Sequence, residues 1–149
     1  LGSVGHIEVS PNSRNVIAGN SLFTIDIRSP DINKLEKMEN ELRDMAIDIC
    51  NKYKVKFEMD QIGGFDPVAF DKECLDNIRN SADKFGYSHK DIVSGAGHDA
   101  CWINTVAPSA MVMCPCVDGL SHNEAEEIKP EWASSSTNVM LHAAIASAT

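Results

Sequence analysis

The sequence has 149 residues and a mass of 16.2 kDa, with 43% hydrophobic and 23% charged residues. This composition excludes disordered and collagen-like chains and predicts one domain or two small halves. Thirteen Lys and Arg residues against 22 Asp and Glu residues give a net charge of −9, which argues against a nucleic acid partner because Lys and Arg bind the phosphates. No apolar run approaches the ~20 residues that span a bilayer, and the N-terminus lacks the order of a signal peptide. We therefore expect neither a membrane nor a nucleic acid partner.

The cysteine content indicates a reducing compartment. The cysteines are odd in number and scattered through apolar or helical segments, which does not suit a disulfide framework, so the cytoplasm is the expected location. One residue separates Cys114 from Cys116, whereas redox and zinc-ribbon pairs use two, and burial as ordinary apolar side chains is the interpretation we favour over a metal or redox site. The five cysteines are Cys50, Cys74, Cys101, Cys114 and Cys116.

The first 60 residues predict a β-α-β unit preceded by a further strand. Residues 6–10 and 22–28 read as strands joined by a turn-rich connection, and apolar residues alternate with polar ones in the second strand, which predicts one buried face. Residues 55–59 alternate in the same way and predict a strand that completes the β-α-β unit. Between them, Ser29 is the expected N-cap and Pro30 the expected first residue of a helix. Its apolar face follows spacings of three and four: Ile32, Leu35, Met38, Leu42, Met45 and Ile49.

Residues 61–67 interrupt this pattern and predict a boundary between two regions. Beyond it, Asp71 is the expected N-cap of a helix that ends at Gly86. Residues 94–99 form a glycine-rich turn before a short helix, and residues 110–113 are an apolar run typical of a buried strand. Pro130 opens a last helix. Its inward-facing residues are expected to be Trp132, Val139, Met140, Ala143 and Ala144.

Two loop histidines, His98 after Gly97 and His122 before Asn123, are candidate functional residues. Loops that follow buried strands often carry chemistry in α/β folds, and imidazole serves both as a zinc ligand and in acid–base or anion-stabilising roles. A metal site needs three or more ligands, and the sequence has no H-E-x-x-H or comparable cluster. From spacing alone, hydrogen-bonded loop histidines are the alternative interpretation.

Arg28, at the exposed end of the second predicted strand, is a candidate for binding a carboxylate. Its guanidinium can pair with a substrate carboxylate in bidentate fashion, and the amide of Asn15 can add further hydrogen bonds. A solvated arginine at a strand end is the plain alternative. The pattern alone does not choose between the two.

Four motifs in order along the chain resemble one enzyme family. They occupy residues 10–17, 23–28, 94–100 and 119–126, and together they are similar to the zinc-dependent amidohydrolases of peptidase family M20 that include N-carbamoyl-L-amino-acid hydrolases, allantoate amidohydrolases and β-ureidopropionases. The resemblance implies an α/β fold in two parts. Residues 1–65 look like the second part of a lid and dimerisation domain with a β-α-β unit, and residues 66–149 look like the C-terminal part of the α/β catalytic domain, so that the chain is a C-terminal fragment.

The same resemblance assigns roles to individual residues. It implies that His122 is a zinc ligand and that Asn15 and Arg28 reach across a homodimer to hold the substrate carboxylate in the neighbouring active site. It implies that Gly97 and His98 bind the substrate near the scissile amide, with His98 as a catalytic residue. The family's other metal ligands and its general-base Glu have no counterpart in this sequence. The 149 residues alone therefore cannot complete the expected centre of two Zn²⁺ ions, for which Mn²⁺ or Co²⁺ are possible substitutes.

The resemblance implies an amidohydrolase as the parent protein. We expect hydrolysis of the carbamoyl group of an N-carbamoyl-L-amino acid to amino acid, carbon dioxide and ammonia, with allantoate as the competing substrate because it carries the same ureido group beside a carboxylate. For the isolated chain, a non-catalytic dimerisation or interaction module is the alternative, since most metal ligands are missing.

Overall fold

A computed structural model describes residues 1–148. The chain divides into two compact units, Leu1–Pro67 and a second that begins at Val68. Both strands lie in the first unit, and helices dominate the second, so the fold combines α and β elements. Among the described residues no helix is long and apolar enough to cross a membrane.

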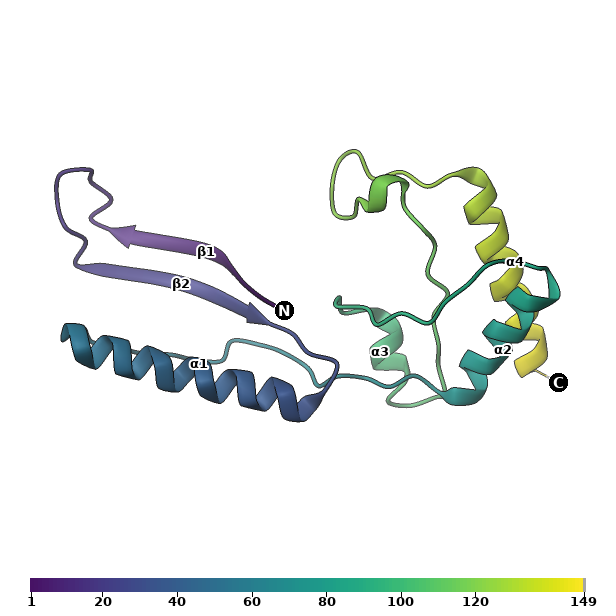
Figure 1. Cartoon of the computed structure of the whole chain (residues 1–149), viewed down its shortest axis with the longest axis horizontal. Helices are drawn as coiled ribbons and strands as arrows, with labels where there is room; N and C mark the ends of the chain where they lie inside the picture. The colour runs from purple at the N-terminus through teal and green to yellow at the C-terminus, as the bar shows by residue number, and fades with distance from the viewer. Residues whose placement is uncertain (149) are drawn as a thin grey trace. The chain divides into compact units, whose positions relative to one another are not determined.

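The first unit is built from an antiparallel hairpin and one long helix (Figure 1). Strand β1, Gly2–Ser10, pairs with β2, Asn20–Ile27, with a register irregularity between Val4 and His6. Helix α1, Ile32–Tyr53, follows β2 and lies along the hairpin. Both predicted N-terminal strands and the predicted helix are confirmed.

The start of α1 differs from the prediction by two residues. Asp31, rather than Ser29, is the N-cap, and its Oδ1 accepts from the backbone N–H groups of Asn33 at 3.0 Å and Lys34 at 3.3 Å. The Ser29 hydroxyl instead accepts from the Asp31 N–H at 3.2 Å. A carboxylate at this position satisfies two of the helix's unpaired donors, and the helix therefore begins at Ile32 instead of Pro30.

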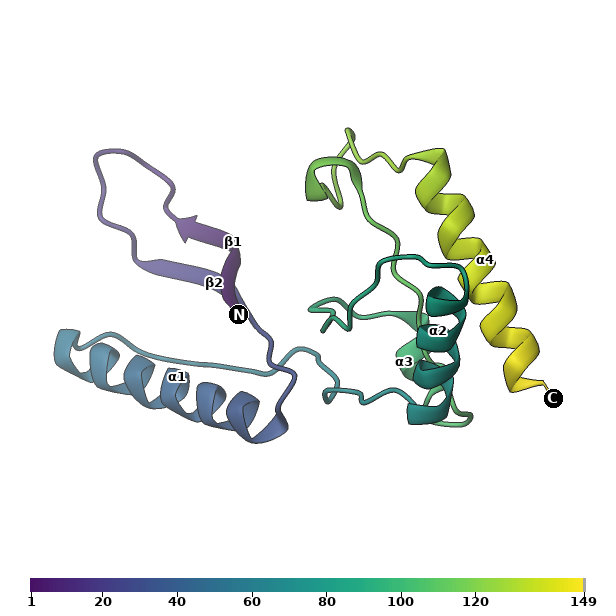
Figure 2. The ribbon, with the colours of Figure 1, turned by 45° about the vertical axis from the view of Figure 1, so that its right-hand side comes forward.

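The predicted strand over residues 55–59 is wrong, and with it the β-α-β unit. After α1 the chain runs back along the helix without pairing with either described strand (Figures 1 and 2). The alternation itself is present, because Phe57 and Met59 are half-buried while Glu58 and Asp60 are exposed. A strand also requires a neighbouring strand for its backbone hydrogen bonds, which the sequence pattern does not supply.

The hairpin and α1 bury less than their patterns predict. Phe23 and Ile25 are 54% and 37% exposed, although the alternation places them on a buried face. On α1, Leu35 and Leu42 are half-buried, whereas Met45 is 62% exposed. A two-stranded hairpin covers only part of a helix face, so the amphipathic pattern exceeds the surface available within this unit.

The second unit is organised around a pair of helices. Helix α2, Lys72–Lys84, packs against α4, Pro130–Ser147 (Figure 2). The shorter elements α3, Asp99–Ile103, and η1, Val117–Gly119, lie between them in sequence. All three helices predicted for this half of the sequence are confirmed.

The core of the second unit is small. Its buried residues come from α2 and α4, and small side chains let the helices approach closely: Ser81, Ala82, Val139 and Ala143. The predicted inward positions Met140 and Ala144 are wrong, since both are exposed. Residues 110–113 form no strand, because this apolar segment has no strand beside it among the described residues.

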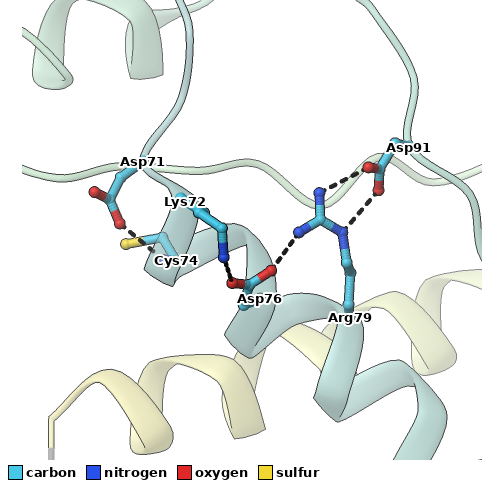
Figure 3. Close-up of polar contacts among 6 residues, drawn as sticks. All are labelled: Asp71, Lys72, Cys74, Asp76, Arg79 and Asp91. Atoms are coloured by element: carbon cyan, nitrogen blue, oxygen red, sulfur yellow. Dashed lines mark hydrogen bonds and ion pairs between the residues drawn. The ribbon is translucent and has the colours of Figure 1, made fainter.

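Asp71 caps α2 as the sequence predicts. Its Oδ1 accepts from the Cys74 N–H at 2.9 Å (Figure 3), and this hydrogen bond holds the pKa of the Asp71 carboxyl below its usual value. We expect Asp71→Ala to lower the melting temperature of the protein, because a helix donor loses its acceptor, whereas Asp71→Asn retains an acceptor and most of the stability. Calorimetry of both variants measures the difference, and equal melting temperatures for Asp71→Ala and the parent would contradict this role.

Candidate functional site

The two substrate-binding candidates of the first unit lie at opposite ends of β2. Asn15 belongs to the loop between β1 and β2, where its Oδ1 accepts from the Ser13 hydroxyl at 2.7 Å. Arg28 directly follows β2 at its other end, and its backbone N–H donates to the Leu1 carbonyl at 2.9 Å. Both residues are exposed, which the sequence predicts for Arg28.

This placement separates Asn15 from Arg28. Strand β2 spans Asn20–Ile27, which at the usual rise per residue is about 23 Å of extended chain. Asn15 lies beyond one end of that strand and Arg28 beyond the other. The side chains of Asn15 and Arg28 therefore do not lie beside each other within this hairpin.

The guanidinium of Arg28 is held by Asp26. Arg28 Nε lies 3.0 Å from each carboxylate oxygen of Asp26, and Nη2 contacts Oδ2. The two residues are two apart on an extended chain and so share one face. This pair lowers the pKa of Asp26, chiefly through the hydrogen bond, and raises that of Arg28. A carboxylate ligand would meet an arginine that is already oriented by a carboxylate.

His98 stands at the N-terminus of α3 with its ring held by Ser94. The Ser94 hydroxyl lies 2.8 Å from His98 Nε2, and it also accepts from the Ala96 N–H at 3.2 Å. His98 is half-buried, while Gly97 beside it is exposed. The glycine-rich turn thus presents a histidine whose ring orientation is fixed from within the turn.

Arg79 anchors the segment that leads into this turn. Its Nε and Nη2 donate to the two carboxylate oxygens of Asp91 at 3.1 and 2.7 Å, and its Nη1 donates to Asp76 at 2.5 Å (Figure 3). Lys72 donates to the other oxygen of Asp76. Bidentate pairing fixes direction as well as distance, so Asp91 ties the chain three residues before Ser94 to α2.

Substitution of Arg79 should destabilise the protein in a pH-dependent way, because its ion pairs with Asp76 and Asp91 are lost. Arg79 lowers the pKa of Asp91, and Lys72, with a smaller contribution from Arg79, lowers the pKa of Asp76. A lowered carboxyl pKa in the folded state contributes stability above the unfolded pKa, near 4, and the contribution is lost as the pH falls through the folded value. We expect Arg79→Gln to melt below the parent protein at pH 6 and to differ little at pH 3. A constant difference at both pH values would contradict the role of these pairs.

His122 lies in a loop between η1 and α4 with an unusual backbone. Its φ is +56°, a region uncommon for residues other than glycine. The Glu126 carboxylate accepts from the His122 N–H at 2.9 Å, and Glu126 N–H donates to the Asn123 carbonyl at 2.9 Å. Within residues 1–148 the His122 ring makes no hydrogen bond. Glu126 therefore closes the loop while the imidazole is left exposed to solvent.

The described residues bring no three His, Cys, Asp or Glu side chains together for a metal ion. His122 can supply one imidazole, which is a fraction of what a zinc or comparable site needs. The donor set within this chain does not by itself fit a metal centre. All five cysteines, which lie within the described part, are free thiols and half-buried. Burial raises the pKa of the Cys116 thiol, and the negative charge of the neighbouring Glu126 raises it further.

The residues that orient the candidate side chains carry little signal in the sequence. Asp26 was available from the two-residue spacing to Arg28, which places both on one strand face. Ser94 and Glu126 carried no such periodic signal, because their contacts depend on loop geometry. Arg79 pairs with a residue 12 positions away across a loop, and no local sequence pattern predicts that contact.

Comparison with known proteins shows which family the chain resembles. Residues 3–146 match the peptidase family M20/M25/M40. The chain belongs to this family. An N-carbamoyl-L-amino-acid amidohydrolase from Rhizobium meliloti is 51% identical over 148 residues, which is 99% of this chain and 36% of the relative. An allantoate amidohydrolase from Escherichia coli is 31% identical, with 82% of this chain and 30% of the relative covered.

Solved structures agree with these sequence matches. The crystal structure of an amidase of the hydantoinase/carbamoylase family from Burkholderia multivorans superposes with a TM-score of 0.90 at 50% identity, over 96% of this chain and 35% of that chain. This M20-family chain thus spans about a third of the length of the relatives it matches.

Proposed function

We propose that the full-length protein hydrolyses a ureido C–N bond, with an N-carbamoyl-L-amino acid as substrate. Water is consumed, and the products are the free amino acid, carbon dioxide and ammonia. The observation that carries the proposal is 51% identity, over 99% of this chain, to a relative named N-carbamoyl-L-amino-acid amidohydrolase. A relative named allantoate amidohydrolase is more distant, at 31%.

In this proposal the chain supplies substrate contacts. Arg28 binds the substrate carboxylate, for which its planar guanidinium is suited. Asn15 is the second proposed contact for this carboxylate across the dimer. Because the length of β2 separates it from Arg28, joint binding would require the loop between β1 and β2 to fold toward Arg28. Gly97 and His98 lie against the scissile group, where the imidazole serves as hydrogen-bond donor or acceptor. The fixed orientation of His98 by Ser94 supports its role.

We propose that His122 supplies one ligand to a metal ion whose other ligands, and the general base, lie outside this chain. Zn²⁺ is the proposed metal, two per site, with Mn²⁺ or Co²⁺ as substitutes. Such ions polarise a carbonyl and activate water when bound. The exposed ring of His122 and its loop closed by Glu126 support the assignment.

The two units suit two roles in a larger enzyme. We propose residues 1–65 as part of a lid that also forms a homodimer, and residues 66–149 as part of the catalytic domain, in the cytoplasm. The exposed apolar residues of the hairpin support this proposal, because another part of the full-length protein or a second copy would cover them.

Allantoate is the second candidate substrate, because it combines a ureido group with a carboxylate. The deciding experiment measures kcat/KM of the full-length protein for several N-carbamoyl-L-amino acids and for allantoate under the same metal conditions. We expect the carbamoyl amino acids to be preferred. A larger kcat/KM for allantoate would replace the proposed substrate and leave the reaction class in place.

The isolated chain is a different case. Because its described residues do not form a metal-ligand group, we propose that it is inactive alone and serves at most as a dimerisation or interaction module. Size-exclusion mass and bound metal of the 149-residue chain test this, with a metal-free dimer as the expected result. Turnover by the isolated chain would contradict it.

A further inference from the structure

The ring of His98 has one side-chain partner among the described residues, and that partner is Ser94. The two residues are four apart, and the distance from Ser94 Oγ to His98 Nε2 is 2.8 Å, normal for a hydrogen bond. No helix or strand periodicity predicts this contact, since the turn between the two residues has no regular structure. The contact therefore depends on the fold of this turn alone.

The surroundings of the Ser94 hydroxyl favour donation to the ring of His98. Its oxygen already accepts from the Ala96 N–H at 3.2 Å. Its hydrogen has two acceptors within reach, His98 Nε2 at 2.8 Å and the Ala96 carbonyl at 3.5 Å. The carbonyl is beyond the usual O–H···O range. A hydroxyl that donates to Nε2 meets the nitrogen of the ring that carries no hydrogen, whereas one that accepts from Nε2–H meets the other tautomer, and the 2.8 Å distance suits both directions.

A neutral imidazole that accepts at Nε2 carries its hydrogen on Nδ1. The partner of one ring nitrogen sets the tautomer, and hence what the other nitrogen offers to a ligand. The ring of His98 then presents an N–H donor on the side away from Ser94. A fixed donor aimed at an oxygen that gains charge during reaction is an effective form of stabilisation.

The backbone on both sides of this pair is also anchored. Upstream, Asp91 is held by Arg79 through two hydrogen bonds. Downstream, the Asn104 side chain at the end of α3 donates to the Ala69 carbonyl at 3.1 Å and accepts from the Ser109 N–H at 3.2 Å. The frame fixes where the turn lies, and the Ser94 hydroxyl remains to set how the ring is turned.

We propose that Ser94 is a positioning residue that fixes His98 as the Nδ1–H tautomer, so that His98 donates a hydrogen bond to the carbonyl oxygen of the scissile ureido group. This inference rests on the proposed function for the identity of the substrate group. Ser94 itself does not touch the substrate. Its loss should therefore lower kcat more than it raises KM, because the donor matters most when charge develops.

The kinetic experiment uses the full-length protein with an N-carbamoyl-L-amino acid. We expect Ser94→Ala to lower kcat by about tenfold, the value of one hydrogen bond, with little change in KM. Ser94→Thr should restore most of kcat, because it keeps the hydroxyl at an exposed position that has room for a methyl group. Ser88→Ala removes another exposed serine from the same segment and should match the parent.

A second measurement reads the tautomer directly, without turnover. In full-length protein labelled with ¹⁵N-histidine at pH 8, the His98 signals, assigned from their loss in His98→Gln, should show Nδ1 protonated and Nε2 unprotonated. In Ser94→Ala this preference should weaken. Where Ser94→Ala does not fold, the isosteric Ser94→Cys replaces it in both measurements.

The results separate the two proposals. A parent protein that hydrolyses no ureido substrate overturns the proposed function, while the NMR signals still decide the tautomer. Parent-like kcat in Ser94→Ala, failure of Ser94→Thr to restore kcat, or a proton on Nε2 of His98 would each overturn the role of Ser94.

Discussion

Arg28→Ala in the full-length protein should lower kcat/KM for an N-carbamoyl-L-amino acid by about one hundredfold, mostly through KM. The expectation follows from the loss of two charge-assisted hydrogen bonds to the substrate carboxylate, each of which contributes about tenfold or more. Metal content should be unchanged, because Arg28 is not a metal ligand. Arg28→Lys should recover only part of the loss, since an ammonium cannot pair in bidentate fashion.

A matched control is available on α1. Arg43 is a partly exposed arginine of the same unit that pairs with Glu39 at 3.5 Å, and Arg43→Ala should leave kcat/KM near the parent value. For substrate analogues that lack the carboxylate, kcat/KM should be similar in the parent and in Arg28→Ala. Unchanged kinetics in Arg28→Ala would remove this residue from the site and leave its pair with Asp26 as a feature of the strand end.

His122→Ala should have the largest effect of the substitutions considered. We expect the activity of the full-length protein to fall by about a thousandfold or more, because loss of a ligand lowers metal occupancy and removes an effect that contributes several kcal/mol. Metal per chain after dialysis, measured by elemental analysis, should fall in parallel. The His122 backbone adopts a positive φ, so the melting temperature should be measured alongside.

His89→Ala is the control for His122→Ala. His89 lies in the same unit and pairs with Asp83 at 2.9 Å, whereas the His122 loop is closed by Glu126. This variant should keep both metal and activity. If His122→Ala instead retained the full metal content with normal melting, His122 would not be a ligand.

Local sequence signals predicted most of the helices and strands correctly. Asp71 as a cap and Pro130 as a first helical residue are short-range effects, which depend on neighbours within one turn. The antiparallel strands are also close in sequence, since the loop between them spans residues 11–19. Elements of this kind require little knowledge of the remaining chain.

The failed predictions share one physical cause. Residues 55–59 and 110–113 have strand-like patterns, but a strand forms only beside another strand. Met140 on α4 and Phe23 on β2 have patterns typical of burial, yet 58% and 54% of their surfaces are exposed. Periodicity shows which face of an element a residue occupies, but it does not show whether another element covers that face.

The site was predictable in part for a related reason. Arg28 and His122 stood out because charged and imidazole side chains occupy a strand end and a polar loop. Ser94, which orients His98, gave no signal, since a hydroxyl in a glycine-rich turn is ordinary and its contact appears only when the turn is folded.

The stoichiometry of the reaction tests ureido hydrolysis. Purified full-length protein, loaded with Zn²⁺ and incubated with an N-carbamoyl-L-amino acid, should release ammonia and free amino acid in equal amounts. The release should stop when the metal is removed by a chelator and resume when it is restored. Metal-loaded protein that produces neither ammonia nor amino acid, from this substrate or from allantoate, would contradict the assignment to ureido hydrolysis.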